Sequence, residues 1–95
     1  MSSDIRLRSI WITNAIGFES VQLSKIFDHY GKISQIVVAD PDKGEFMIVF
    51  LSSDIATKAL NFDGKTAKGS TLNVKIPNSF QFESVLHPLT NCQID

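Results

Sequence analysis

The chain alternates between two patterns of apolar positions, one repeating every second residue and one repeating every third or fourth residue. The first pattern is typical of a half-buried strand and the second of a helix with one buried face. The patterns predict strands at Ser9 to Thr13, Ile33 to Ala39, Glu45 to Leu51 and Thr71 to Ile76. They predict helices between Ser20 and Gly31 and from Asp54 to about Leu60.

Residues at the ends of these segments agree with the prediction. Ser20 is a suitable N-cap for the first helix, and Gly31 is a suitable residue to end it. Ser52 or Ser53 would cap the second helix. The residues 40–44, Asp-Pro-Asp-Lys-Gly, have the composition of a tight turn, so the strands on either side should form an antiparallel hairpin.

The predicted order of elements is β-α-β-β-α-β, which is typical of a ferredoxin-like α+β sandwich. In that fold a four-stranded antiparallel sheet packs on two helices and leaves its other face open. The chain has 95 residues, which is the size of one domain. We place this domain at residues 8–76, with an N-terminal tail at 1–7 and a C-terminal extension at 77–95.

Charge and targeting signals narrow the class of protein. The net charge is −1, which argues against strong non-specific binding of nucleic acid, because phosphate binding needs clustered Lys and Arg. The single cysteine, Cys92, makes no internal disulfide. We identify no signal peptide and no apolar run long enough to cross a membrane. The expected compartment is the nucleus or the cytoplasm, with no membrane partner.

Two short segments resemble the signatures of the RNA-recognition motif, the ribonucleoprotein domain. They are the hexamer Ile10-Trp11-Ile12-Thr13-Asn14-Ala15 and the octamer Lys43-Gly44-Glu45-Phe46-Met47-Ile48-Val49-Phe50. Other positions match family patterns that mostly describe core packing: Leu23, Ile26, Phe27, Tyr30, Gly31, Ile33, Phe50, Asp54, Ala56, Ala59, Leu60, Gly64, Gly69, Leu72 and Val74. The resemblance covers the chain from about Arg8 to Ile76, and it implies the fold above and a role in RNA binding or mRNA processing.

The octamer departs from the family pattern at the positions that stack on bases. The pattern places aromatic residues third and fifth, where this chain has Glu45 and Met47. A carboxylate cannot stack, and each lost stack lowers affinity by about 1–3 kcal/mol. The resemblance therefore implies a weak RNA-binding module, one of several in a larger protein.

Period-two alternation assigns the residues of the open face. The candidate RNA-binding residues on or beside this face are Trp11, Thr13, Gln35, Lys43, Met47, Asn73 and Lys75. By resemblance, Trp11 would stack on a base, while Lys43 and Lys75 would contact phosphate. Asn73 and Gln35 would read base edges. Lys43 and Lys75, with Arg6 and Arg8, would form a modest basic rim.

The C-terminal extension offers a second interpretation of Trp11. Asn78 and Gln81 have the spacing of a capping box, which predicts the start of a helix. We expect Phe80 or Phe82, with Leu86, to dock near Trp11 and Met47. Trp11 is then either a stacking platform or a residue covered by the chain itself.

These features favour a monomeric, single-stranded RNA-binding module over two alternatives. The first alternative is a protein-interaction module of the same fold, which Met47, Val49 and the near-neutral charge would suit. The second is an enzyme. His29 and His87 have no Cys, Ser or carboxylate at metal or triad spacing, so we expect no catalytic residue, metal or cofactor.

Overall fold

The computed structural model describes residues 2–85 and confirms the predicted α+β fold. Four strands form one antiparallel sheet in the order β2-β3-β1-β6. They are β1 (Ser9–Thr13), β2 (Ile33–Asp40), β3 (Glu45–Phe50) and β6 (Asn73–Lys75). The first two strands of the chain are thus separated by β3, which is the split βαβ arrangement.

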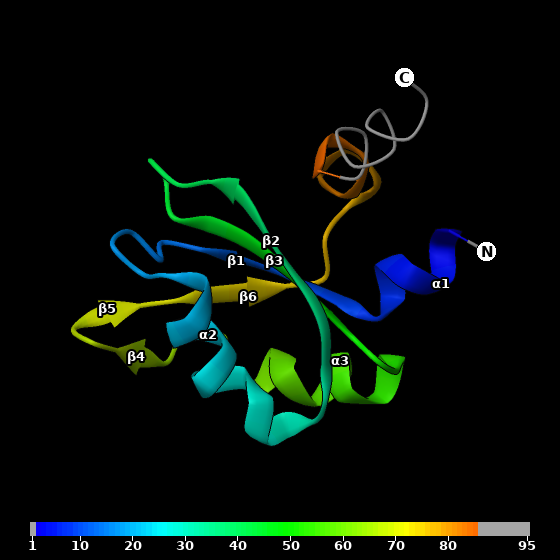
Figure 1. Ribbon diagram of the computed structural model, residues 1–95, viewed down its shortest axis with the longest axis horizontal. Helices are drawn as coiled ribbons and strands as arrows, with labels where there is room; N and C mark the ends of the chain where they lie inside the picture. The colour runs from blue at the N-terminus through cyan, green and yellow to red at the C-terminus, as the bar shows by residue number, and fades with distance from the viewer. Residues whose placement is uncertain (1, 86–95) are drawn as a thin grey trace.

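Helices α2 (Ser20–Phe27) and α3 (Ser53–Ala59) cover one face of the sheet (Figure 1). Each is followed by a 3₁₀ turn, η1 (Asp28–Tyr30) and η2 (Leu60–Phe62). Alternate residues of the strands point into the core between these layers, and its largest fully buried side chains include Ile10, Ile12, Leu23, Phe27, Ile48, Phe50, Leu72 and Val74. For β1 and β3, the alternation in the sequence therefore assigned the helix-facing residues as the structure has them.

The first helix begins one residue earlier than expected. Its N-cap is Glu19, not Ser20, and Glu19 forms a capping box with Gln22. The second helix has the expected N-cap, since the Ser52 hydroxyl accepts a hydrogen bond from the backbone N–H of Ile55. The turn before β3 is also built as expected, with the Asp40 carboxylate accepting from the backbone of Asp42 and Lys43.

The segment before the last strand contains a small hairpin that the apolar pattern missed. Strands β4 (Thr66–Ala67) and β5 (Ser70–Thr71) pair around a two-residue turn. Both turn residues, Lys68 and Gly69, have positive φ, as tight hairpin turns of this type require. The last strand of the main sheet therefore starts at Asn73 rather than Thr71.

The two ends of the described chain are helical. Residues 2–7, which we expected to be a tail, form helix α1 (Ser2–Leu7). Residues 79–85 form the C-terminal helix, which lies on the sheet face opposite α2 and α3 (orange in Figure 1). Leu86, His87 and Cys92 fall outside the described residues. Within residues 2–85, no helix is both long and apolar enough to cross a membrane.

Candidate nucleic-acid interface

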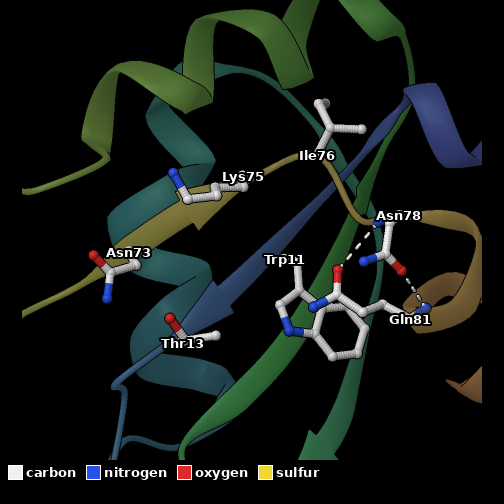
Figure 2. A pocket seen from close by; sticks show the side chains of 7 residues that line it. All are labelled: Trp11, Thr13, Asn73, Lys75, Ile76, Asn78 and Gln81. Atoms are coloured by element: carbon white, nitrogen blue, oxygen red, sulfur yellow. Dashed lines mark hydrogen bonds between the residues drawn. The ribbon is translucent and has the colours of Figure 1, made fainter.

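A hollow of about 340 Å³ opens on the sheet face beside the start of the C-terminal helix (Figure 2). Strand β1 and the edge strand β6 form its floor, and the connection from β6 into the helix forms one wall. The residues that line it are Trp11, Thr13, Asn73, Lys75, Ile76, Asn78 and Gln81. Four of the seven candidate RNA-binding residues therefore meet at one place.

These four residues converge because β1 and β6 are paired antiparallel. Trp11 lies opposite Lys75, and Thr13 lies opposite Asn73. Residues directly opposite in such a pair have side chains on the same face of the sheet. The neighbours Ile12 and Val74 point into the core instead.

The Trp11 indole lies beneath the C-terminal helix. Its side chain is 5% exposed and belongs to an apolar group that we call the sheet-face cluster, made of Trp11, Met47, Val49, Phe82 and Val85. Its Nε1–H is buried and has no hydrogen-bond acceptor among the described residues. A buried donor without a partner lowers stability by about 1–3 kcal/mol.

The two amide side chains in the wall are held by a reciprocal pair of hydrogen bonds. The Asn78 side-chain oxygen accepts from the backbone N–H of Gln81 at 2.7 Å. The Gln81 side-chain oxygen accepts from the backbone N–H of Asn78 at 3.1 Å. This is the capping box that the spacing predicted, and it starts the C-terminal helix beside the hollow (Figure 2).

Lys75 supplies the positive charge of the hollow. Its Nζ atom lies 3.9 Å from the Asp63 carboxylate, and the two side chains are 75% and 41% exposed. An ion pair at this distance and exposure contributes about 0–1 kcal/mol. Lys75 is thus only loosely held and can reach an anionic ligand.

The other three candidate residues do not join this group. Met47 belongs to the sheet-face cluster and is 2% exposed, so a ligand cannot reach it in this conformation. Gln35 is exposed on β2, which lies at the opposite edge of the sheet from β6. Lys43 is exposed in the turn between β2 and β3, next to the Gly44 carbonyl that bonds Ala15.

Two of the four cations expected to form a basic rim bond to main-chain carbonyls. Arg6 donates to the Pro77 carbonyl at 2.8 Å, and Arg8 donates to the Leu51 carbonyl at 3.3 Å. Both side chains are therefore used in internal contacts. Arg8 lies near the Phe50 end of β3, whereas Lys43 precedes its other end. Lys43 therefore lies at the far end of β3 from Arg8.

Sequence reasoning missed Asn78 and Gln81 as site residues, although it found their spacing. The available signal was the position of the capping box, which begins three residues after the end of the last strand. In the part of the chain that the structure describes, no three His, Cys, Asp or Glu side chains converge as a metal site would require.

Neither protein-family models nor curated proteins gave a match to this sequence. Solved structures did match, at low sequence identity. The first is a crystal structure of the N-terminal three RNA-binding domains of the yeast splicing factor Prp24, with a TM-score of 0.72 and 21% identity over 79% of this chain and 34% of that one.

Two further structures share the fold. A complex of the Sxl-lethal protein with RNA matches with a TM-score of 0.67 and 22% identity, over 78% of this chain and 50% of the other. The RRM3 domain of Mip6 matches with a TM-score of 0.71 and 13% identity, over 77% of this chain and 96% of the other. The chain spans about a third of the Prp24 structure and half of the Sxl-lethal one. The fold of this protein is that of an RNA-recognition motif.

Proposed function

We propose that this protein binds single-stranded RNA through the hollow between β1, β6 and the start of the C-terminal helix. The observation that carries the proposal is the meeting of Trp11, Thr13, Asn73 and Lys75 around one open space. Its volume of about 340 Å³ is at the lower end of the usual range for small-ligand sites. That size suits one nucleotide and its phosphate better than a run of stacked bases.

The lining has the groups that single-stranded RNA requires. Unpaired bases present hydrogen-bonding edges that side chains can read directly. Thr13 and Asn73 line the hollow and would contact such an edge, and the exposed Lys75 would meet a phosphate. The edge of the Trp11 indole forms part of the wall, so Trp11 would contact a base without a full stack.

We expect the affinity to be low. Glu45 and Met47 replace two stacking aromatics, and the Trp11 face is occupied by the C-terminal helix. Two missing stacks, at about 1–3 kcal/mol each, would move a micromolar binder toward millimolar. A domain of this strength would act as one module of a larger RNA-binding protein, where tethering raises the effective concentration. A role in mRNA processing in the nucleus or cytoplasm fits such a module.

An NMR titration with a mixed pool of short single-stranded RNAs at low salt tests the proposal. Amide signals of Thr13, Asn73 and Lys75 and the Trp11 indole signal should shift, and the shifts should shrink as salt rises. Signals of the exposed α3 residue Lys58 should stay unchanged and serve as the internal control. No shift at millimolar RNA would overturn the proposal.

A second candidate function is protein binding by the outer face of the C-terminal helix. Phe80 is 83% exposed there, on the side away from Phe82. A large aromatic residue with so much exposed area is more typical of a contact surface than of a surface in water. This function would be favoured if the unchanged protein bound no RNA and Phe80→Ala abolished its binding to a protein partner.

A further inference from the structure

The two edges of the main sheet differ in how their backbone groups are used. At the β6 edge, the Asp63 carboxylate accepts a 2.8 Å hydrogen bond from the backbone N–H of Val74. Just before this strand, Leu72 exchanges backbone hydrogen bonds with Gly64 and Lys65. The chain itself therefore covers much of the β6 edge. Strand β2 forms the other edge, and within residues 2–85 no strand pairs with its outer side.

Hydrogen bonds at the end of β3 show which of its residues bond to β2. Phe50 donates its backbone N–H to the carbonyl of Arg8, just before β1. The next residue, Leu51, donates to the carbonyl of Lys32, just before β2. Successive residues of a strand bond to opposite neighbours. The odd-numbered residues of β3 therefore bond toward β2 and the even-numbered residues toward β1.

That alternation identifies the outward-facing backbone groups of β2. The odd-numbered residues of β3 lie opposite Gln35 and Val37, so these two residues use their backbone groups to bond to β3. Ile36 and Val38 direct their N–H and C=O groups away from the sheet. Among residues 2–85, no backbone or side-chain group bonds to them. They form an open template for another strand.

The side chains of this edge lack the features that keep exposed strands apart. Residues 33–39, Ile-Ser-Gln-Ile-Val-Val-Ala, contain no charge, proline or glycine, and such segments pair readily with other strands. Val38 is 47% exposed, although Phe46 opposite it is buried in the core. Register shifts near both ends of β2 confine regular pairing to residues 35–38, so the edge accepts a short strand in a defined register.

Charges at the two ends of β2 favour a second copy of the same strand. The exposed Lys32 precedes the strand, whereas Asp40 ends it and the exposed Asp42 follows in the turn. Lys43, in the same turn, reduces the negative charge at that end without cancelling it. Two copies related by a two-fold axis pair antiparallel, which brings the basic end of each strand to the acidic end of the other.

We propose that the protein forms a two-fold symmetric dimer in which two β2 strands pair antiparallel along their free edges. With the axis through Val37, Ile36 of each copy lies opposite Val38 of the other, and Lys32 lies near Asp42 of the other. Each Ile36 and Val38 pair exchanges two backbone hydrogen bonds, and their side chains cover each other. The dimer differs from the monomer that the sequence favoured, and it leaves the hollow near the opposite edge open.

Sedimentation equilibrium of the full chain at concentrations up to about 1 mM tests the proposal. We expect the mass to rise from 10.5 kDa toward twice that value. Hydrogen exchange at the Ile36 and Val38 amides should slow over the same range, whereas the Gln35 and Val37 amides, already bonded to β3, should change little. A mass that stays at 10.5 kDa would overturn the proposal. Slow exchange at Ile36 and Val38 in a monomer would also overturn it, because the chain itself would then cover this edge.

The variant Val38→Lys connects the dimer to the β2 edge. It places a charge beside the centre of the paired strands, and we expect the dissociation constant of the dimer to rise about tenfold. Val21→Lys is the matched control, because Val21 is 56% exposed on α2 and the change adds the same charge away from the edge. The control should dimerise like the unchanged protein. Equal dimerisation of both variants would overturn the proposal, since the contact would then lie elsewhere.

Charge reversal tests the antiparallel orientation. Lys32→Glu or Asp42→Lys alone brings like charges together at both ends of the paired strands, and each should raise the dissociation constant several-fold. The double variant exchanges the two signs and should recover the affinity of the unchanged protein. A double variant as weak as the single variants would overturn the antiparallel arrangement. These measurements use no RNA, so their outcome is independent of the proposed RNA-binding function.

Discussion

The guanidinium of Arg6 donates a 2.8 Å hydrogen bond to the main-chain carbonyl of Pro77. The contact joins helix α1 to the connection between β6 and the C-terminal helix. Pro77 is fully buried, and the neighbouring Ile5 packs against the sheet-face cluster. The N-terminal helix thus supports the segment that positions the C-terminal helix.

The first prediction concerns this support. Arg6→Ala should remove a charge-assisted hydrogen bond that contributes about 1.5–3 kcal/mol. We expect faster hydrogen exchange at the Phe82 amide, which bonds to the Asn78 carbonyl in the C-terminal helix. Exchange at core amides of β3 should change less. Lys25→Ala on the exposed side of α2 is the control, and equal acceleration in both variants would contradict the role of Arg6.

The second prediction concerns the cover over Trp11. Phe82→Ala removes an aromatic ring that is 4% exposed from the sheet-face cluster. We expect the free energy of unfolding to fall by about 3 kcal/mol and the Trp11 emission to shift to longer wavelength. Phe80→Ala, on the same helix but 83% exposed, should change the stability by less than about 0.5 kcal/mol. Similar losses in the two variants would show that the helix does not dock through Phe82.

The third prediction concerns the glycine of the octamer. Gly44 has a φ of +69°, and an added Cβ would collide with the backbone of Ala15 and Ile16. We expect Gly44→Ala to lower the free energy of unfolding by about 3 kcal/mol or more. Gly64→Ala is the matched control, because Gly64 has a φ of +84° but open space around it. It should lose only about 1–2 kcal/mol, the penalty for left-handed backbone, as chemical denaturation would measure.

The fourth prediction tests whether Lys75 contacts phosphate. Lys75→Gln should reduce the slope of log affinity against log salt for a short RNA by about one. Lys58→Gln removes the same charge from α3, on the opposite side of the sheet, and should leave the slope unchanged. Equal slopes in both variants and the unchanged protein would exclude Lys75 as a phosphate contact.

The fold was predictable because its signal is local and repeated. The alternation Ile10, Ile12 on β1 and Phe46, Ile48, Phe50 on β3 identifies one buried face without any knowledge of distant contacts. The hairpin at residues 66–71 gave no such signal, since its strands are two residues long and mostly polar. Its turn, Lys68-Gly69, was the available clue.

The site was only partly predictable, because its composition depends on contacts between distant segments. The pairing of Trp11 with Lys75 follows from the topology, and the sequence analysis placed both residues on one face. The hydrogen bond from Arg6 to the Pro77 carbonyl does not follow from any local pattern, because the two residues are 71 positions apart. The sequence analysis therefore predicted the shared face of Trp11 and Lys75 but not the contact between Arg6 and Pro77.

The capping box at Asn78 and Gln81 has a thermodynamic consequence. The same two side chains that start the C-terminal helix also line the hollow, so an occupant that bonds to them also favours the helical state. By linkage the coupling is reciprocal: whatever raises the population of the helix raises affinity in the hollow by the same factor. The stability of the C-terminal helix therefore contributes to affinity in the hollow. A substitution that changes this stability would change the affinity even if the substituted residue does not contact the ligand.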